Sequence, residues 1–411
     1  GIDFFWIAAI GLVVLTALYT IFGGMKSVLY TSVLQTPILL LGSLIILVLG
    51  FKELGGWDEM MRVCGAVTVN DYGDTMTNLI RSNDDANFPW LGALIGSAII
   101  GFWYWCPDQF IVQRVLSGKN EMEARRGTIF GAYLKLLPVF LFLIPGMIAF
   151  ALHQKYIGAG GEGFLPMLEN GTANADAAFP TLVAKLLPAG VKGLVVCGIL
   201  AALMSSLASL FNSSAMLFTI DFYKRFRPQT SEKKLVGIGQ VATVVIVILG
   251  ILWIPIMRSV GDVLYTYLQD VQSVLAPGIA AAFLLGICWK RTSAQGGMWG
   301  LISGMVIGLT RLGAKVYYSN AGEVADSTFK YLFYDMNWLF FCGWMFLFCI
   351  IVVIVVSLAT EAPTAEKIQG LVFGTATKEQ KASTRASWNH WDIIHTVIIL
   401  AITGAFYWYF W

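Results

Sequence analysis

The sequence predicts an all-α polytopic membrane protein with about ten transmembrane helices. Of its 411 residues, 57% are hydrophobic and only 13% are charged, whereas about a quarter of residues are charged in a typical soluble domain. Ten segments are apolar over the roughly 20 residues that a helix needs to cross a bilayer. They span 4–22, 28–50, 92–114, 128–153, 188–224, 235–257, 263–288, 295–315, 337–359 and 391–411.

Charge and cysteine content exclude several classes of function. The formal net charge of +2 is too small to indicate a nucleic-acid partner. Five of the six cysteines lie in apolar segments, and their spacing fits neither a disulfide framework nor a metal site. The chain begins at Gly1, and an apolar segment follows within a few residues, without a charged leader or cleavage site before it. We therefore expect the chain to be truncated at its N-terminus.

Basic residues in short loops predict the orientation. They cluster in three loops, between 114 and 126, between 224 and 234, and at 290–291. If every intervening segment crosses, the three loops share one side, and the positive-inside rule makes that side cytoplasmic. The acidic loop 51–91 then faces outward, and the polar loop 360–390 lies inside.

The segment from Trp103 to Arg114 is the most informative. Three aromatic residues, Trp103, Tyr104 and Trp105, precede Pro107 and Asp108 within an apolar stretch. A proline frees backbone groups that lipid cannot satisfy, so a broken spanning helix must be buried in protein or line a polar cavity. An interfacial aromatic belt is the alternative. We interpret the segment as one wall of a solute path.

Two further polar side chains lie within apolar segments. Lys135 is about 11 Å into its segment at 1.5 Å per residue. It either extends to the cytoplasmic interface or donates hydrogen bonds into a cavity. Gln269 begins a segment that we expect to be interrupted at Pro277-Gly278, and it can donate and accept at a ligand or serve as a capping or packing residue.

A stripe of small and hydroxylated residues follows one face of segment 188–224. Its pairs at i and i+4 allow close helix packing without any ligand. Hydroxyl and carbonyl oxygens also suit an alkali cation, although a second, unwound segment would have to complete the shell. The stripe consists of Ala202, Ser205, Ser206, Ser209 and Ser213.

These motifs resemble the sodium/glucose cotransporters of the solute:sodium symporter family. Four blocks match in family order, and only about the last 120 residues match loosely. The blocks are Trp103 to Arg114, Tyr133-Leu134-Lys135-Leu136 with Pro145-Gly146-Met147, Leu203 to Ser213, and Phe283 to Arg291.

The resemblance implies a five-plus-five inverted-repeat core in which discontinuous helices hold substrate near the midplane. The first segment here would be the fourth core helix, so the first three core helices would be absent from this chain. We expect residues 1–291 to form the partial core and residues 292–411 to add accessory helices, with loop 360–390 in the cytoplasm.

The resemblance also implies roles for individual residues. Tyr104 resembles the aromatic gate that stacks on the sugar, and Trp105 its neighbour in the pocket. Lys135 and Gln269 resemble residues that hydrogen-bond sugar hydroxyls. Gly101 stands where relatives place Asn or Thr facing the sugar, so it is a substrate-binding position at which this chain departs from the family.

The implied main sodium site consists of the Ala202 carbonyl and the Ser205 and Ser206 hydroxyls. At a second sodium site this chain carries Ser32 where relatives carry Asp, and Ala208 where two-sodium members carry Thr. These departures remove a carboxylate and a hydroxyl, so we expect one sodium per sugar.

We therefore expect a multi-pass plasma-membrane symporter that moves glucose or galactose with sodium, and neither an enzyme nor a protein with an organic cofactor. Alternatives are a sodium/myo-inositol symporter, a sugar-responsive sensor on the same fold, a proton-driven symporter with Asp108 as relay, and a symporter for an amino acid, a vitamin or an organic anion. The expected partners are a small sugar or polyol, sodium and the lipid bilayer, with no nucleic acid. The sequence leaves the oligomeric state open.

Overall fold

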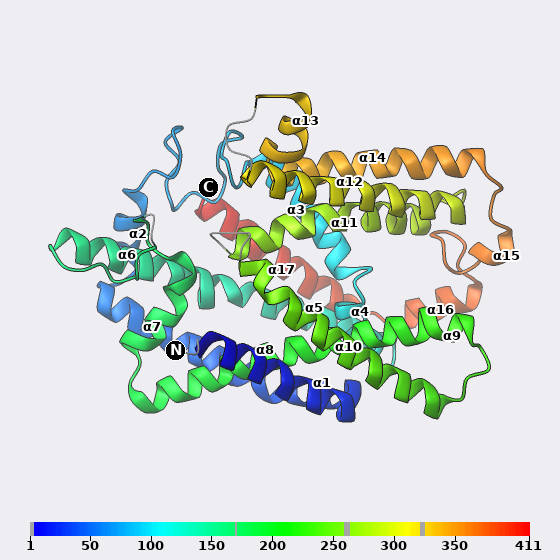
Figure 1. Ribbon diagram of the computed structural model, residues 1–411, viewed down its shortest axis with the longest axis horizontal. Coiled ribbons are helices and arrows are strands. Elements are labelled where there is room, and N and C mark those ends of the chain that lie inside the picture. The colour runs from blue at the N-terminus through cyan, green and yellow to red at the C-terminus, as the bar shows by residue number, and fades with distance from the viewer. Residues whose placement is uncertain (1–3, 169–170, 259–263, 321–324) are drawn as a thin grey trace. The chain divides into compact units, whose positions relative to one another are not determined.

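The computed structural model describes residues 4–168, 171–258, 264–320 and 325–411, and these fold into helices joined by loops (Figure 1). Eight helical segments of the described residues are long and apolar enough to cross a membrane, or nine if one bent pair counts as a single span. The described residues contain no regular strand. The predicted all-α polytopic class is therefore confirmed.

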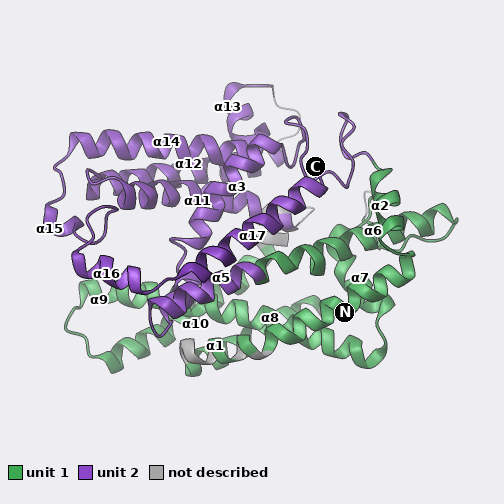
Figure 2. Cartoon of the chain, turned by 180° about the vertical axis from the view of Figure 1, so that it is seen from behind, with its two compact units in different colours: residues 1–67, 134–261 green, residues 68–133, 262–411 purple. Residues whose placement is uncertain are grey.

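The chain divides into two compact units (Figure 2). Unit 1 contains residues 1–67 and 134–261, and unit 2 contains residues 68–133 and 262–411. These units are defined by compactness. The expected division at residue 291 separates the partial transporter core from accessory helices, and it stays a prediction. Helix α5 (Glu121–Pro138) passes from unit 2 into unit 1 at residue 134.

Unit 1 is built on the pairing of α1 with α8. The approach is close because Gly42 and Gly198 lack a side chain: a Cβ on Gly42 would lie 2.7 Å from the Val195 side chain, and one on Gly198 would lie 3.0 Å from Ile38. Helix α10 adds a small apolar cluster. The helices of this unit are α1 (Phe4–Leu54), α2 (Trp57–Gly65), η1 (Val139–Leu143), α6 (Ile144–Gly158), η2 (Ala175–Ala177), α7 (Ala178–Leu186), α8 (Ala189–Met216), η3 (Leu217–Tyr223), α9 (Lys224–Phe226) and α10 (Glu232–Arg258).

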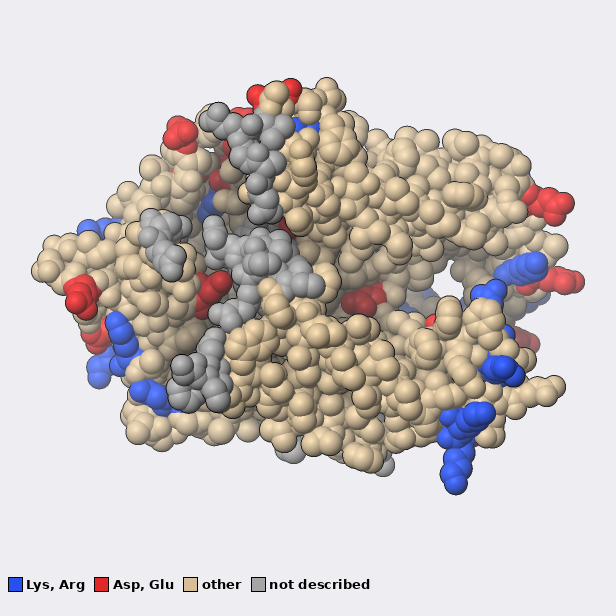
Figure 3. Space-filling model, viewed as in Figure 1, with Lys and Arg blue, Asp and Glu red and all other residues tan. Residues whose placement is uncertain are grey.

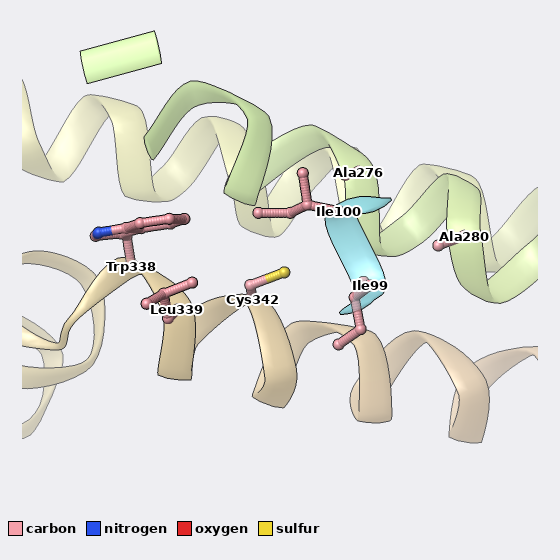
Figure 4. Packing of buried hydrophobic residues seen from close by; sticks show 7 residues of the cluster. All are labelled: Ile99, Ile100, Ala276, Ala280, Trp338, Leu339 and Cys342. Atoms are coloured by element: carbon pink, nitrogen blue, oxygen red, sulfur yellow. The ribbon is translucent and has the colours of Figure 1, made fainter. Parts of the chain in front are cut away.

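Unit 2 has its core where α3, α11 and α14 meet. Ile99 and Ile100 of α3 pack against Ala276 and Ala280 of α11 and against α14 (Figure 4). The surface visible over α12 and α14 is almost entirely uncharged (Figure 3). Besides most of α5, the helices of this unit are α3 (Trp90–Trp105), α4 (Gln109–Leu116), α11 (Leu264–Cys288), α12 (Ala294–Asn320), α13 (Thr328–Lys330), η4 (Tyr331–Asp335), α14 (Trp338–Ala359), α15 (Ala365–Ile368), α16 (Lys378–Ala386) and α17 (His390–Tyr409).

Hydrogen bonds between loops show which ends of the unit 2 helices lie together. At one end, Arg125 donates to the Ser387 hydroxyl (3.1 Å), and Arg291 donates to the Thr360 carbonyl (2.6 Å). At the other end, Leu79 N–H donates to the Phe410 carbonyl (2.8 Å). Two predicted cytoplasmic loops therefore share an end with loop 360–390, as the orientation requires.

Three expectations about the membrane-spanning segments differ from the structure. Segments 4–22 and 28–50 belong to one continuous helix, α1, although two separate windows of it qualify as spans. Helix α11 is not interrupted at Pro277, which lies inside it, and the next residue, Gly278, packs directly on α12, where its Cβ would lie 3.3 Å from the Gly304 Cα. Helix α12 does not qualify as a span by apolarity, since its many glycines together with Arg311 and Lys315 lower its mean hydropathy.

Candidate functional site

The predicted broken helix is confirmed. Helices α3 and α4 meet at an angle of 49°. Pro107 has no N–H to continue the helix, and Asp108 caps the new one by accepting from the Phe110 N–H at 3.1 Å. The sequence Pro107-Asp108 therefore both ends α3 and starts α4. The alternative role of Asp108 as a proton relay stays a prediction, since the cap uses one of its two carboxylate oxygens.

The aromatic residues come immediately before the break. The rings of Tyr104 and Trp105 meet edge to face with centroids 5.4 Å apart. Tyr104 is half-buried, whereas Trp105 is 46% exposed. One turn earlier, Gly101 has open space beside it, since a Cβ there would meet no atom within 4 Å. The structure thus brings Gly101, Tyr104 and Trp105 together on the last turns of α3.

Gln269 lies on α11 at a different depth. It is half-buried, and it shares a helical face with Ala276 and Ala280, which pack on α3. The Phe102 ring lies 6.1 Å from the Phe283 ring. Phe283 is fourteen positions after Gln269, which corresponds to about 21 Å along a helix. The structure therefore points Gln269 toward the α3 side but does not bring it next to Tyr104.

Lys135 lies in unit 1, on the part of α5 that begins at residue 134. Its side chain is exposed. Because Tyr104 and Gln269 belong to unit 2, a shared site for the three stays a prediction.

The predicted sodium ligands lie on α8 in unit 1. Ala202 and Ser206 are four residues apart, on the same face, while Ser205 is turned by about 100° toward α1. Ser205 is buried and Ser206 is exposed. The Ser205 carbonyl accepts a hydrogen bond from the fully buried Ser209 hydroxyl at 3.0 Å. The three predicted oxygens are thus within about one turn, partly at the α1 contact and partly on an open face.

Ser32 of α1 joins this cluster. Its hydroxyl lies 2.5 Å from the Ser205 hydroxyl, across 173 positions of sequence. Tyr19 of α1 donates to the Met204 carbonyl at 2.8 Å, which fixes the same contact one residue earlier on α8. Sequence reasoning identified Ser32 only as a lost ligand of a second sodium site and missed its contact with the main one. Nothing in the local pattern indicates which residue of α1 faces Ser205.

Sequence reasoning also missed an ion network in unit 2. Asp270, which directly follows Gln269 on α11, accepts from Lys315 of α12 at 2.5 Å, and its other oxygen lies 3.7 Å from Arg311. Arg311 is fully buried, donates to the Met336 carbonyl at 2.7 Å and stacks 4.1 Å from the Phe341 ring. The spacing of Arg311 and Lys315, four apart in a glycine-rich apolar stretch, was the available signal.

Unit 2 also has an open pocket of about 350 Å³ between α5 and α17. Its lining includes Arg126, Tyr133 and His395, and the Tyr133 hydroxyl lies 3.0 Å from His395 Nδ1. None of the predicted sugar-binding residues lines this pocket. It is therefore separate from the broken helix.

Comparisons with known proteins agree on one family. Residues 1–304 match the model of the sodium:solute symporter family. The sodium/myo-inositol cotransporter 2 of Homo sapiens is 36% identical over 381 residues, which cover 90% of this chain and 56% of that protein. The sodium/glucose cotransporter 4 of Mus musculus is also 36% identical over 381 residues, with the same coverage of 90% and 56%.

Two further matches are informative. The sodium/mannose cotransporter of Bos taurus is 35% identical over 433 residues, which cover 99% of this chain and 72% of that protein. A solved structure of a sodium-coupled sialic acid symporter, in a substrate-bound outward-open state, superposes with a TM-score of 0.65 at 20% identity, over 89% of this chain and 68% of that one. The chain spans about half the length, 56%, of several of the curated relatives. It belongs to the sodium:solute symporter family.

Proposed function

We propose that the protein is a sodium-driven symporter that carries a monosaccharide, glucose or galactose, or a close polyol such as myo-inositol, across the plasma membrane by alternating access. Family membership supports transport, and the names of the relatives support a sugar or polyol. The observation that carries sodium coupling is the oxygen cluster of Ser32, Ser205 and Ser209 where α1 meets α8.

The cluster suits a sodium ion on chemical grounds. Hydroxyl and carbonyl oxygens are hard ligands, and in apolar helices they have few competing partners. Ser205 is held at the α1 contact, whereas Ser206 and the Ala202 carbonyl present oxygens on the neighbouring open face. A second, unwound segment on that face would complete the coordination shell, as the discontinuous helices of this transporter class do.

We place the sugar contacts at the two ends of the α3–α11 contact and not along it, since Ala276 and Ala280 are fully buried there. An aromatic ring such as Tyr104 suits the flat C–H surface of a pyranose, and Gly101 leaves open space one turn away. Gln269 lies nearer the outer end, and Lys135 would donate from α5. Gln269 lies about 21 Å along α11 from Phe283, whose ring contacts Phe102, two residues before Tyr104. We therefore assign Gln269 and Tyr104 to successive sugar contacts as access alternates, with Gln269 met first from outside.

Uptake by the full-length protein tests the proposal. Reconstituted in proteoliposomes, it should accumulate labelled glucose, galactose or myo-inositol under an inward sodium gradient and not under an equal potassium gradient. Ser206→Ala removes one ligand and should raise the half-saturating sodium concentration about tenfold, which corresponds to about 1.4 kcal/mol. Ser213→Ala is the matched control, since it removes a hydroxyl bonded to its own helix two turns further on, and should leave that concentration within about twofold.

Two results would contradict the proposal. Equal uptake in sodium and potassium with a response to an imposed pH step would favour proton coupling. Binding of sugar without any flux would favour a sensor. Competition among glucose, galactose, mannose and myo-inositol then identifies the preferred substrate.

A further inference from the structure

The ion network of Asp270, Lys315 and Arg311 ties three helices together at the end of unit 2 that the orientation assigns to the outside. Lys315 Nζ lies 2.5 Å from one oxygen of Asp270. Arg311 donates to the carbonyls of Leu332 (3.3 Å) and Met336 (2.7 Å), which precede α14. Because Arg311 is held on two sides by α14 and its preceding turn, the network links α11 to α14 through α12.

The network fixes the rotation of α11 about its own axis. Consecutive residues of a helix point about 100° apart. Asp270 therefore faces α12 while Gln269, immediately before it, faces the α3 side, together with Ala276 and Ala280. Deeper along α11, Gly278 packs on Gly304 of α12. Near the outer end, Asp270 is buried beside Lys315 and Arg311, one position after Gln269.

We propose that Asp270, held by Lys315 and Arg311, is a positioning residue for Gln269 and thereby sets the affinity for sugar without affecting the affinity for sodium. The inference rests on the proposed role of Gln269 in sugar binding. Asp270 acts through Gln269 rather than on the substrate, since its carboxylate is directed to α12. The sodium cluster lies in unit 1, whereas the network lies in unit 2.

A double-mutant cycle in the full-length protein tests this. Asp270→Asn keeps the size and removes the charge; it should raise the half-saturating sugar concentration about tenfold and change the half-saturating sodium concentration less than twofold. Gln269→Ala should have a similar effect on sugar. In the double variant Asp270→Asn should add nothing, because the residue through which it acts is gone. Uptake is measured per molecule at the membrane.

A change of cation is the second arm. Lys315→Arg keeps a positive charge beside Asp270 and should leave the half-saturating sugar concentration within about threefold of the wild type, whereas Lys315→Gln should raise it as Asp270→Asn does. If Asp270→Asn fails to reach the membrane, Lys315→Gln takes its place in the cycle. The matched control is Lys330→Gln, which breaks the exposed pair with Asp326 (2.8 Å) in the same unit and should change neither concentration.

The outcomes separate this inference from the proposed function. Multiplicative effects of Asp270→Asn and Gln269→Ala, or equal shifts in sugar and sodium concentrations, would show a general structural role and overturn the inference alone. An Asp270→Asn variant that behaves like an active wild type would do the same. A wild type that takes up no sugar with sodium would overturn both.

Discussion

The helix contact α1–α8 of unit 1 and the contact α11–α12 of unit 2 both hold polar groups between apolar helices, but the groups differ in charge. Both bring polar groups between apolar helices that pack closely at glycines. In unit 1 the polar groups are neutral hydroxyls, Ser32 and Ser205. In unit 2 they are full charges, Asp270 with Lys315 and Arg311.

This difference indicates what each contact can do. A neutral oxygen cluster has no built-in cation, so a sodium ion can enter and leave without displacing one. A buried ion network already contains its cations and is sensitive to the loss of any single member. We therefore associate reversible ion binding with the α1–α8 contact and fixed geometry with the α11–α12 contact.

The largest effect that the comparison predicts is at Arg311. Arg311→Met keeps the apolar stem but leaves the Leu332 and Met336 carbonyls without their donor and Asp270 with Lys315 alone. Removing one partner from a buried charge network costs about 3 to 5 kcal/mol. Thermal unfolding of the purified protein in detergent measures the loss.

The control for Arg311→Met is a variant on α1 in unit 1, whose contact with α8 contains uncharged polar groups. Ser43 of α1 is 1% exposed, and its buried hydroxyl has no hydrogen-bond partner among the described residues. Ser43→Ala should therefore leave the free energy of unfolding unchanged or raise it slightly, because no bond is lost. A loss at Ser43 as large as that at Arg311 would remove the distinction between the two contacts.

A second prediction concerns a negative charge introduced at the α1–α8 contact. With Ser32 and Ala208 as they are, sodium titration of uptake should give a Hill coefficient near one and one charge moved per sugar. One sodium driven by ~100 mV and a tenfold gradient supplies about 2.3 plus about 1.4 kcal/mol, enough for a sugar gradient of roughly 500-fold. Ser32→Asp with Ala208→Thr should raise both the Hill coefficient and the charge toward two.

Ala208→Thr alone serves as the control for this pair of changes. It adds a hydroxyl at a fully buried position but no negative charge, and should leave one charge per sugar. A wild type that already moves two charges per sugar would refute the expected stoichiometry, whatever the variants do.

The break between α3 and α4 was predicted correctly, because Pro107 and Asp108 change backbone hydrogen bonding within one helical turn of their own positions. The interruption expected at Pro277 is wrong, since α11 is continuous there, with Gly278 packed on α12. A cap depends on its neighbours in sequence, whereas the packing around Pro277 involves a helix that lies elsewhere in the chain.

The candidate sites show the same limit. The serines of α8 were visible as a stripe, but their partner Ser32 lies 173 positions away, and a pattern within one helix cannot show which residue of another faces it. The role of Asp270 likewise depends on Lys315 and Arg311, which lie on another helix. Hydropathy predicts the segments and the basic loops predict their direction, whereas the pairing of residues between helices must come from the structure.

A third kind of polar contact lies outside the membrane segments, at the start of α14. Asp85 is 5% exposed and accepts from the backbone N–H groups of Asn87 (2.9 Å) and Phe88 (2.7 Å). Burial alone would raise its pKa, but these N–H donors, with Arg81 and Asn70 nearby, hold the pKa below its ordinary value. Asn337, the cap of α14, donates to the adjacent Ala86 carbonyl at 2.7 Å.

The smallest predicted effect follows from this lowered pKa. A carboxyl whose pKa is lower when folded stabilises the folded loop above its unfolded pKa of about 3.9, and that contribution is lost as the pH falls through the folded value. Amide exchange at Asn87 and Phe88 should therefore lose protection only below about pH 4. Asp85→Asn should cost about 1 kcal/mol at neutral pH and abolish this acid dependence, while the exposed Asp84→Asn should retain it. Acid dependence that survives in Asp85→Asn would place the titrating group elsewhere. The hydroxyl contact of unit 1 has no group that titrates in this range, so amides of α1 and α8 around Ser32 and Ser205 should show no such transition.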